Sequence, residues 1–483
     1  MADAVHGNVL ASLRGITQDH VRAGTPLTIS LSIPGMGEVM CAEVFRAIPG
    51  KRLVCLGKLG EARVIVKLYY APRRAHRHWK RSDKGCRAFL RRGIPAPEIL
   101  FSGYLAQYDL YAMVLEFLEG GVRIDQALAA VPEKGMGEEL PGLLMAELAR
   151  HHASGIIQND LHLGNFMVRD HIVHSLDGDQ VEERGKPHGR RSSLRNLARL
   201  LANINTSRDS DLDAWIQSYM RERRWSMTEA DQEALKARIY RMRRRNLSAY
   251  LGKTLRSRDP FVAQSGAGLF TVFDKRHTGV LLPDILHSAG RTKKAEGALG
   301  RIGYQVRTIG DRQLLQLSSC GAGPLGFMRL FSAARVWRNA LMLNRIGLQT
   351  PQPVALVMQQ KLPLIWKCSV LSMPVEGIGL RDFLLSANVS QEVRDRLAAG
   401  LVDALVRMTG VGVSPGGLMP EHILVAGEAL VFIDPAAFRR PFVAPRARIA
   451  RAVKRFLSLC ANIPGIDGLT WNGSSFRREP GSS

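Results

Sequence analysis

The sequence has few cysteines and no long apolar run. Its six cysteines are scattered without a C-x-x-C pair, which argues against a zinc site and predicts free, buried thiols in a reducing cytoplasm. No run of about 18 apolar residues occurs without a charge, so we expect no transmembrane helix. The first fifteen residues lack a basic start and an apolar core, so we expect no signal peptide.

Acidic residues are also scarce relative to basic ones. The chain has 67 Lys and Arg against 43 Asp and Glu, a net charge of +24. Such a field attracts polyanions, namely nucleic acid, an acidic membrane face or a phosphorylated substrate. The two densest basic segments are residues 73–92 and 238–256.

At 483 residues the chain is too long for one ordinary core, and two domains are expected. We expect the first domain at residues 36–270 and a linker rich in glycine at 271–298. A second domain at 299–465 and a flexible tail at 466–483 complete this division.

The first domain opens with short apolar runs and then a helix. Residues 36–70 predict strands separated by turns at Pro49-Gly50 and at residues 57–60, and Lys67 closes the last of these runs. Residues 73–92 predict a helix that Gly93 stops, and a second helix is expected from Pro141 to His152. Residues 166–176 predict a short hairpin.

The most informative stretch runs from Asp160 to Asn165, and Asp177 follows twelve residues later at the end of the predicted hairpin. The hairpin would return the chain so that Asp177 lies near Asn165. Phosphoryl transfer that depends on Mg²⁺ uses these residue types: one carboxylate accepts the proton of an attacking hydroxyl, while an amide oxygen and a second carboxylate bind the metal. Lys67 could reach the nucleotide phosphates, although no G-x-G-x-x-G loop precedes it.

The second half of the chain repeats this layout. Residues 347–351 resemble 93–97, and residues 431–434 resemble 174–177. The first copy has 67 residues from Gly93 to Asp160 and 17 more to Asp177, and the second has 70 from Gly347 to Gly417 and 17 more to Asp434. The chemistry is not copied, because Asp160, Asn165 and Lys67 are replaced by Gly417, His422 and Gln316.

This layout resembles the bacterial lipopolysaccharide kinases, which phosphorylate heptose or Kdo sugars of the inner core. The resembling segments are residues 49–54, 64–69, 92–97 and 152–165 in the first copy, and 334–340 and 433–434 in the second. The resemblance implies an α+β fold of two tandem protein-kinase-like domains, each with a small β-rich N-lobe and a helical C-lobe.

The resemblance also implies roles for matching residues. Asp160 would be the general base, Asn165 and Asp177 the Mg²⁺ ligands, and Lys67 the phosphate-binding lysine. The hinge that holds the adenine of ATP through backbone groups would be Glu116, Phe117 and Leu118.

Three positions depart from the family pattern. Gln158 stands where a histidine usually precedes the catalytic Asp by two residues. The helix acid that should pair with Lys67 is replaced by Ser82, with Asp83 beside it. Asp179 is a second candidate for the metal, although the spacing favours Asp177.

The prediction is therefore a kinase that uses ATP and Mg²⁺ and acts on lipopolysaccharide core sugar at the inner face of the inner membrane. Its second domain would be a degenerate kinase without catalysis. The anionic membrane surface would be a partner, and no specific nucleic acid is expected. Alternatives are a protein or small-molecule kinase on the same fold, or a non-catalytic pseudokinase scaffold at the membrane. Nucleic-acid binding would explain the charge but leaves the Asp160–Asp177 arrangement unexplained.

Overall fold

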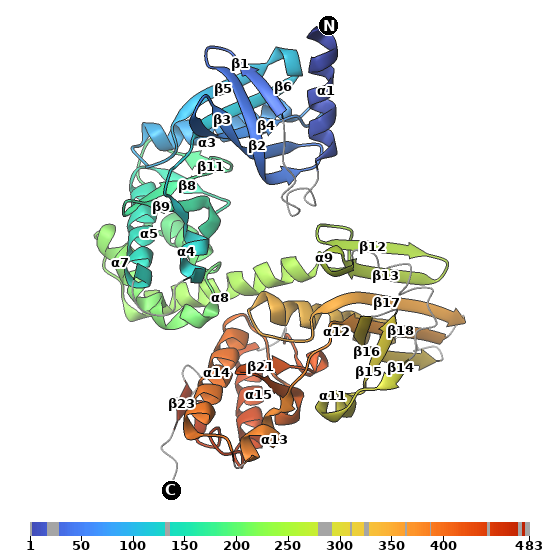
Figure 1. The fold of residues 1–483 in the computed structure, drawn as a ribbon. Helices are drawn as coiled ribbons and strands as arrows, with labels where there is room; N and C mark the ends of the chain where they lie inside the picture. The colour runs from blue at the N-terminus through green and yellow to red at the C-terminus, as the bar shows by residue number, and fades with distance from the viewer. Residues whose placement is uncertain are drawn as a thin grey trace. The chain divides into compact units, whose positions relative to one another are not determined.

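The computed structural model describes residues 2–16, 29–130, 136–278, 292–309, 312–322, 328–362, 365–386, 388–441, 445–471 and 476–478. It divides into two compact units (Figure 1). Unit 1 comprises Met1–Ile204 and Ser210–Ile239, and unit 2 comprises Asn205–Asp209 and Tyr240–Ser483. Both units mix helices and strands, as the α+β prediction requires.

Unit 1 begins with an antiparallel sheet of six strands in the order β1-β2-β3-β4-β6-β5. Gly50 and Gly60 adopt positive φ in the turns that join β2 to β3 and β3 to β4, where a residue with a Cβ would be strained. These hairpins confirm the strands predicted over residues 36–70. The strands are β1 (Ile29–Ile33), β2 (Gly37–Ile48), β3 (Arg52–Leu59), β4 (Ala62–Tyr69), β5 (Ile99–Leu105) and β6 (Leu110–Glu116).

Helix α3 (Ala75–Arg91) packs on this sheet, as the sequence predicted. Its buried face is built of small and apolar residues, including Cys86 and Phe89, while its basic residues point outward. Gly93 ends the helix at φ +64°. The N-terminal helix α1 (Ala2–Gly15) contributes the buried Leu13 to the core of the same sheet.

The rest of unit 1 is mainly helical and carries the predicted hairpin. Helix α5 begins at Met136, earlier than predicted, so Pro141 lies in its second turn rather than its first. The hairpin joins β9 to β10 through Asp170 and His171, both at positive φ. The elements are α4 (Ile124–Ala130), α5 (Met136–Ala153), β7 (Val122–Arg123), β8 (Ile156–Gln158), η2 (Leu163–Asn165), β9 (Phe166–Arg169), β10 (Ile172–Ser175), β11 (Val181–Glu183), α6 (Arg190–Leu201), α7 (Leu212–Glu222) and the first half of α8 (Glu229–Leu251). The division assigns α8 to unit 2 from Tyr240 onward.

The end of α5 holds a buried neutral histidine, which predicts a pH-dependent stability. His152 Nε2 faces Asn196 Oδ1 at 3.0 Å and its Nδ1 faces the Tyr219 hydroxyl at 2.6 Å. Burial lowers the pKa of His152 to about 3. The pKa of His152 in the folded chain lies below its value in the unfolded chain. As the pH falls, the unfolded chain therefore binds more protons than the folded chain, and stability is lost below about pH 6.5.

We expect this one group to remove about 2 kcal/mol of unfolding free energy between pH 7 and pH 5. His152→Gln should flatten that part of the pH profile in chemical denaturation. His171→Gln, on the exposed turn, serves as the matched control and should keep the wild-type slope. Equal slopes in all three proteins would contradict the assignment.

Unit 2 contains an antiparallel sheet of seven strands in the order β12-β13-β17-β18-β16-β15-β14. The strands are β12 (Phe261–Gly266), β13 (Leu269–Asp274), β14 (Thr292–Lys294), β15 (Tyr304–Ile309), β16 (Arg312–Ala322), β17 (Pro353–Leu362) and β18 (Ile365–Ser372). Its main helices are α11 (Gly297–Ile302), α12 (Met328–Arg345), α13 (Leu380–Leu385), α14 (Gln391–Gly410) and α15 (Pro445–Leu459).

Two of the predicted domain limits need correction. Strand β12 pairs with β13, and β13 pairs with β17, so residues 261–274 belong to the sheet of unit 2 and not to a first domain or a linker. Ile466 and Leu469 are buried in the unit 2 core, so the chain from 466 to 471 is not a tail. Residues 279–291 of the predicted linker lie outside the described residues.

Two predictions concern the state of the cysteines and the presence of membrane-spanning helices. Five cysteines (Cys41, Cys55, Cys86, Cys368 and Cys460) are free and buried, as predicted. Within the described ranges, no helix has both the length and the apolar character needed to cross a membrane.

Candidate active site

The loop that follows β8 presents Asp160 at the surface. Its neighbour Leu161 is buried and anchors the chain. The backbone on both sides is fixed by side-chain donors, because Arg199 Nη1 donates to the Asn159 carbonyl at 2.6 Å and Asn203 Nδ2 donates to the Leu161 carbonyl at 2.9 Å. The Asp160 carboxylate is thus exposed on a loop whose backbone cannot easily move, as a general base requires.

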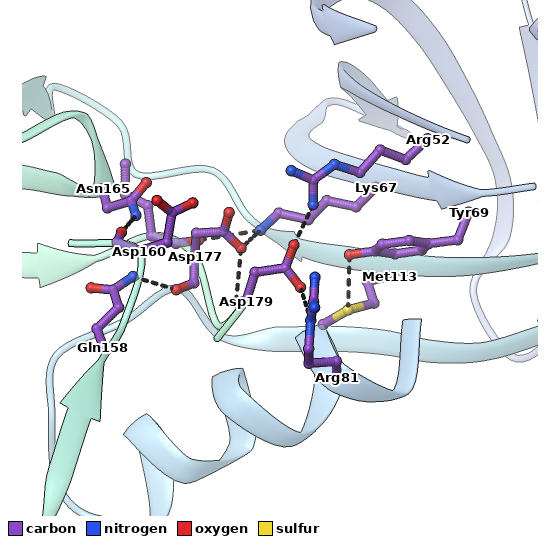
Figure 2. Close-up of polar contacts among 11 residues, drawn as sticks. Arg52, Lys67, Tyr69, Arg81, Met113, Gln158, Asp160, Asn165, Asp177 and Asp179 are labelled. Carbon is purple, nitrogen blue, oxygen red and sulfur yellow. Dashed lines mark hydrogen bonds and ion pairs between the residues drawn. The ribbon is translucent and has the colours of Figure 1, made fainter. Parts of the chain in front are cut away.

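Lys67, Asn165 and Asp177 come together beside this loop (Figure 2). Lys67 Nζ on β4 lies 3.5 Å from Asp177 Oδ1 and donates to the Leu176 carbonyl at 3.3 Å. The hairpin returns the chain as predicted, because the Leu176 amide donates to the Asn165 carbonyl at 2.9 Å. Four predicted residues, Lys67, Asp160, Asn165 and Asp177, therefore share one site.

The Lys67–Asp177 pair is largely buried, and each charge supports the other. Burial alone lowers the pKa of Lys67, but the Asp177 carboxylate and smaller contributions outweigh it, and the net shift is upward. Burial alone raises the pKa of Asp177, but Lys67, Arg52 and the Asp179 amide outweigh it, and the net shift is downward. Both groups therefore stay ionised at neutral pH.

The donor set suits Mg²⁺. Asn165 Nδ2 donates to the Asp160 carbonyl at 2.7 Å, and since that carbonyl only accepts, the amide oxygen is left for a cation. This oxygen and the Asp177 carboxylate are the hard ligands that Mg²⁺ prefers. The described part of the chain has no cluster of three or more His, Cys, Asp or Glu fit for a metal. The remaining ligands would have to be nucleotide phosphate and water.

The predicted hinge, residues 116–118, begins at Glu116, the last residue of β6. Two of its backbone groups are already engaged, because the Glu116 amide donates to the Glu98 carbonyl and the Leu118 carbonyl accepts from the Gly121 amide. The ring of Phe117 lies under the Arg63 guanidinium at 4.2 Å. Adenine binding through this segment stays a prediction and would have to use its other backbone groups.

Gln158 has a structural task at the place of the expected histidine. It is fully buried, and its Nε2 donates to the Asp177 carbonyl at 2.8 Å. The backbone carbonyl of Gln158 accepts a hydrogen bond from Asn196 Nδ2 at 2.9 Å. Gln158 thus ties the strand before Asp160 to the loop that holds Asp177.

Asp83, which stands beside the place of the missing helix acid, pairs with a residue other than Lys67. Asp83 is the sole acid of α3, and it pairs with Arg87 on the same helix at 2.9 Å. Ser82 is fully buried. The partner of Lys67 in the structure is Asp177, on the loop rather than the helix.

Two glycines bring α3 against the Asp177 loop. A Cβ on Gly85 would lie 1.9 Å from the Gly178 carbonyl oxygen, and a Cβ on Gly178 would lie 2.3 Å from the Cys86 amide nitrogen. Backbone therefore meets backbone at this point, and a side chain on either residue would push helix and loop apart.

Sequence reasoning missed two charged residues of this site, Arg52 and Arg81, and the contacts that Asp179 makes with them. Asp179 is buried, and its carboxylate pairs with Arg52 Nη1 at 2.5 Å and with Arg81 Nε at 3.4 Å (Figure 2). The sequence offered one signal, the second acid in Asp177-Gly178-Asp179. Nothing local indicated that Arg52 and Arg81 would meet it.

Unit 2 repeats the backbone contacts of this site without its side chains. The Ile433 amide donates to the His422 carbonyl at 2.9 Å, as Leu176 does to Asn165. His422 and Asp434 lie 3.4 Å apart, where unit 1 has Asn165 and Asp177. Gln316, at the predicted place of Lys67, is buried and bonds to Ser318 and Ser369.

The sequence matches no model of a known protein family and no curated protein. Among solved structures, it is similar to the PknI kinase domain of Mycobacterium tuberculosis, with 14% identity and a TM-score of 0.26 over 36% of this chain and 72% of that domain. It is also similar to vaccinia related kinase 3, with 13% identity and a TM-score of 0.29 over 51% of this chain and 94% of that one. The names of both neighbours describe kinases.

Proposed function

We propose that this chain is a kinase that transfers the γ-phosphate of ATP to a sugar hydroxyl. The observation that carries the proposal is the convergence of Lys67, Asp160, Asn165 and Asp177, which come from three separate segments of unit 1. Phosphoryl transfer needs positioning and charge stabilisation more than covalent chemistry, and this set supplies both.

In the proposed reaction Asp160 accepts the proton of the acceptor hydroxyl as its oxygen attacks the γ-phosphorus and ADP leaves. Lys67 holds the phosphates of ATP, and Asp177 keeps Lys67 charged and oriented. Bound Mg²⁺, held by Asn165 and Asp177, would neutralise charge on the phosphates.

The acceptor we propose is a heptose or Kdo residue of the lipopolysaccharide inner core. The resemblance of residues 49–54, 64–69, 92–97 and 152–165 to lipopolysaccharide kinases supports it. The net charge of +24 also supports an anionic acceptor in a membrane, because each basic residue near an anionic surface adds roughly 1 kcal/mol of attraction. The protein would then lie on the inner face of the inner membrane.

We further propose that unit 2 is a degenerate kinase-like domain that binds substrate, membrane or a partner. Gly417 has no carboxylate to act as a base, and its amide donates to the Ala437 carbonyl at 2.8 Å. His422 beside Asp434 supplies a cationic or neutral nitrogen where Mg²⁺ needs a hard oxygen.

The test is transfer of label from ATP carrying a labelled γ-phosphate, with Mg²⁺ and the full chain. Separate reactions would contain dephosphorylated core oligosaccharide, a mixture of proteins, or no acceptor. We expect label on the oligosaccharide and none on protein. Label on protein alone would favour a protein kinase on the same fold, and no binding of Mg-ATP would favour the scaffold.

A further inference from the structure

Asp179 connects three elements of the site through one buried carboxylate. Its Oδ2 accepts from Arg52 on β3 and its Oδ1 from Arg81 on α3, while its backbone belongs to the loop that carries Asp177. The Asp179 side chain is 8% exposed. A buried carboxylate is tolerated when cations pair with it, and here two arginines do so.

We propose that Asp179 is a positioning residue that fixes α3 and β3 to the loop carrying Asp177, in place of an ion pair between Lys67 and a helix acid. This inference rests on the proposed function of the site. Asp179 does not touch the reacting groups and acts through Asp177, because its amide donates to Asp177 Oδ1 at 3.1 Å.

The charges are reversed relative to the missing pair of a strand lysine and a helix acid. The strand lysine pairs with Asp177 on the loop rather than with an acid on the helix. Helix α3 instead supplies the cation, Arg81, and the loop supplies the acid. The contact of Gly85 with Gly178 brings the helix and loop backbones so close that Arg81 and Asp179 meet beside it.

The same contacts separate the roles of the two loop acids. Both oxygens of Asp179 face arginine nitrogens, which compete with any metal for them. Asp177 instead lies beside Lys67 and near Asn165 (Figure 2). Asp177 is thus the metal ligand of the pair, and Asp179 holds it in place.

The test compares Asp179→Asn with Asp83→Asn in the full chain. Both substitutions remove one carboxylate charge, but Asp83 pairs only along α3 with Arg87. For Asp179→Asn we expect amide hydrogen exchange in α3 and at residues 177–179 to rise about tenfold. We expect kcat to fall about 10²-fold and KM for ATP to stay within about threefold, since a misplaced ligand loses geometry rather than ground-state binding.

Asp83→Asn should leave exchange near residues 177–179 and kcat at wild-type values. Arg81→Gln provides a second probe if Asp179→Asn folds poorly, because Arg81 is 47% exposed. It should lower kcat about tenfold, and Arg81→Lys should restore much of that loss.

Three results would overturn the inference. The first is wild-type amide exchange and wild-type kcat in Asp179→Asn. The second is increased amide exchange with unchanged kcat in that variant, which would leave Asp179 only a structural role. The third is a change in exchange and kcat in Asp83→Asn that equals the change in Asp179→Asn. If the wild-type chain transfers no phosphate to any acceptor, the proposed function fails. The exchange comparison then still decides whether Asp179 holds the loop to α3.

Discussion

Replacing Asp160 with asparagine is expected to lower kcat for phosphoryl transfer about 10³-fold, since the variant cannot accept the proton of the attacking hydroxyl. The side chain is exposed and keeps nearly its shape, so the fold should not change. Asn165 bonds to the backbone carbonyl of residue 160, and that contact survives the substitution. Binding of Mg-ATP should therefore stay at the wild-type level.

The measurement is the single-turnover rate of transfer to core oligosaccharide, with nucleotide binding followed by calorimetry. Asp170→Asn is the matched control, because Asp170 lies in the exposed turn of the adjacent hairpin with a side chain that is 88% exposed. It should transfer phosphate at the wild-type rate. Transfer by Asp160→Asn at the rate of this control would remove Asp160 from the mechanism.

Replacing Asp177 with asparagine is expected to weaken Mg²⁺-dependent ATP binding about 10²-fold and to reduce kcat further, because a metal ligand and the partner of Lys67 are lost together. It should also destabilise unit 1 by about 1–3 kcal/mol, since Lys67 is left buried without its counter-ion. Calorimetric titration with ATP, with and without Mg²⁺, separates the loss of the metal ligand from the loss of the partner of Lys67. Only the part of the binding loss that is due to the metal ligand disappears when Mg²⁺ is omitted.

The pH dependence of this loss has a definite sign. The folded pKa of Asp177 lies below its ordinary value, so its stabilisation is present above about pH 4 and disappears as pH falls through the folded pKa. Asp177→Asn should therefore differ most from wild type in unfolding free energy near neutral pH, and the difference should shrink on acidification. A constant difference would contradict the ion pair.

Asp434→Asn makes the same change in the counterpart loop of unit 2 and is the control for Asp177→Asn. We expect its kcat and its affinity for ATP to stay within about threefold of wild type, because the role proposed for unit 2 includes no catalysis. Complete loss of transfer with intact folding and acceptor binding would show that unit 2 is not passive.

The sequence predicted which residues meet at the candidate site, because the signals of these residues are local. An acid, an amide five positions later and a hairpin of fixed length before Asp177 determine which groups can meet. The strand that carries Lys67 followed from a short apolar run and the turns beside it. The repeat of this layout in residues 347–434 stays a prediction, and the matching backbone contacts of Asn165 and His422 support it.

The sequence could not predict contacts and limits that depend on distant residues. It left open which acid pairs with Lys67, whereas the structure leaves Asp83 to Arg87 and pairs Lys67 with Asp177. The first domain was wrongly extended to residue 270, because nothing in the sequence of β13 shows that it pairs with β17, about ninety residues later. Strand pairing across such a distance is set by packing of the whole sheet.

By itself, the sequence determined which chemical groups are available for the predicted site: one candidate base, two candidate metal ligands and one strand lysine, of which the predicted second copy keeps only one acid. Only the tertiary structure decided how the two acids of residues 177–179 divide their tasks. Asp177 faces Lys67 while Asp179 faces Arg52 and Arg81. The physical reason is that alternate residues of a tight loop point to different neighbours. Those neighbours lie about a hundred residues earlier in the chain, so only the fold brings them to the loop.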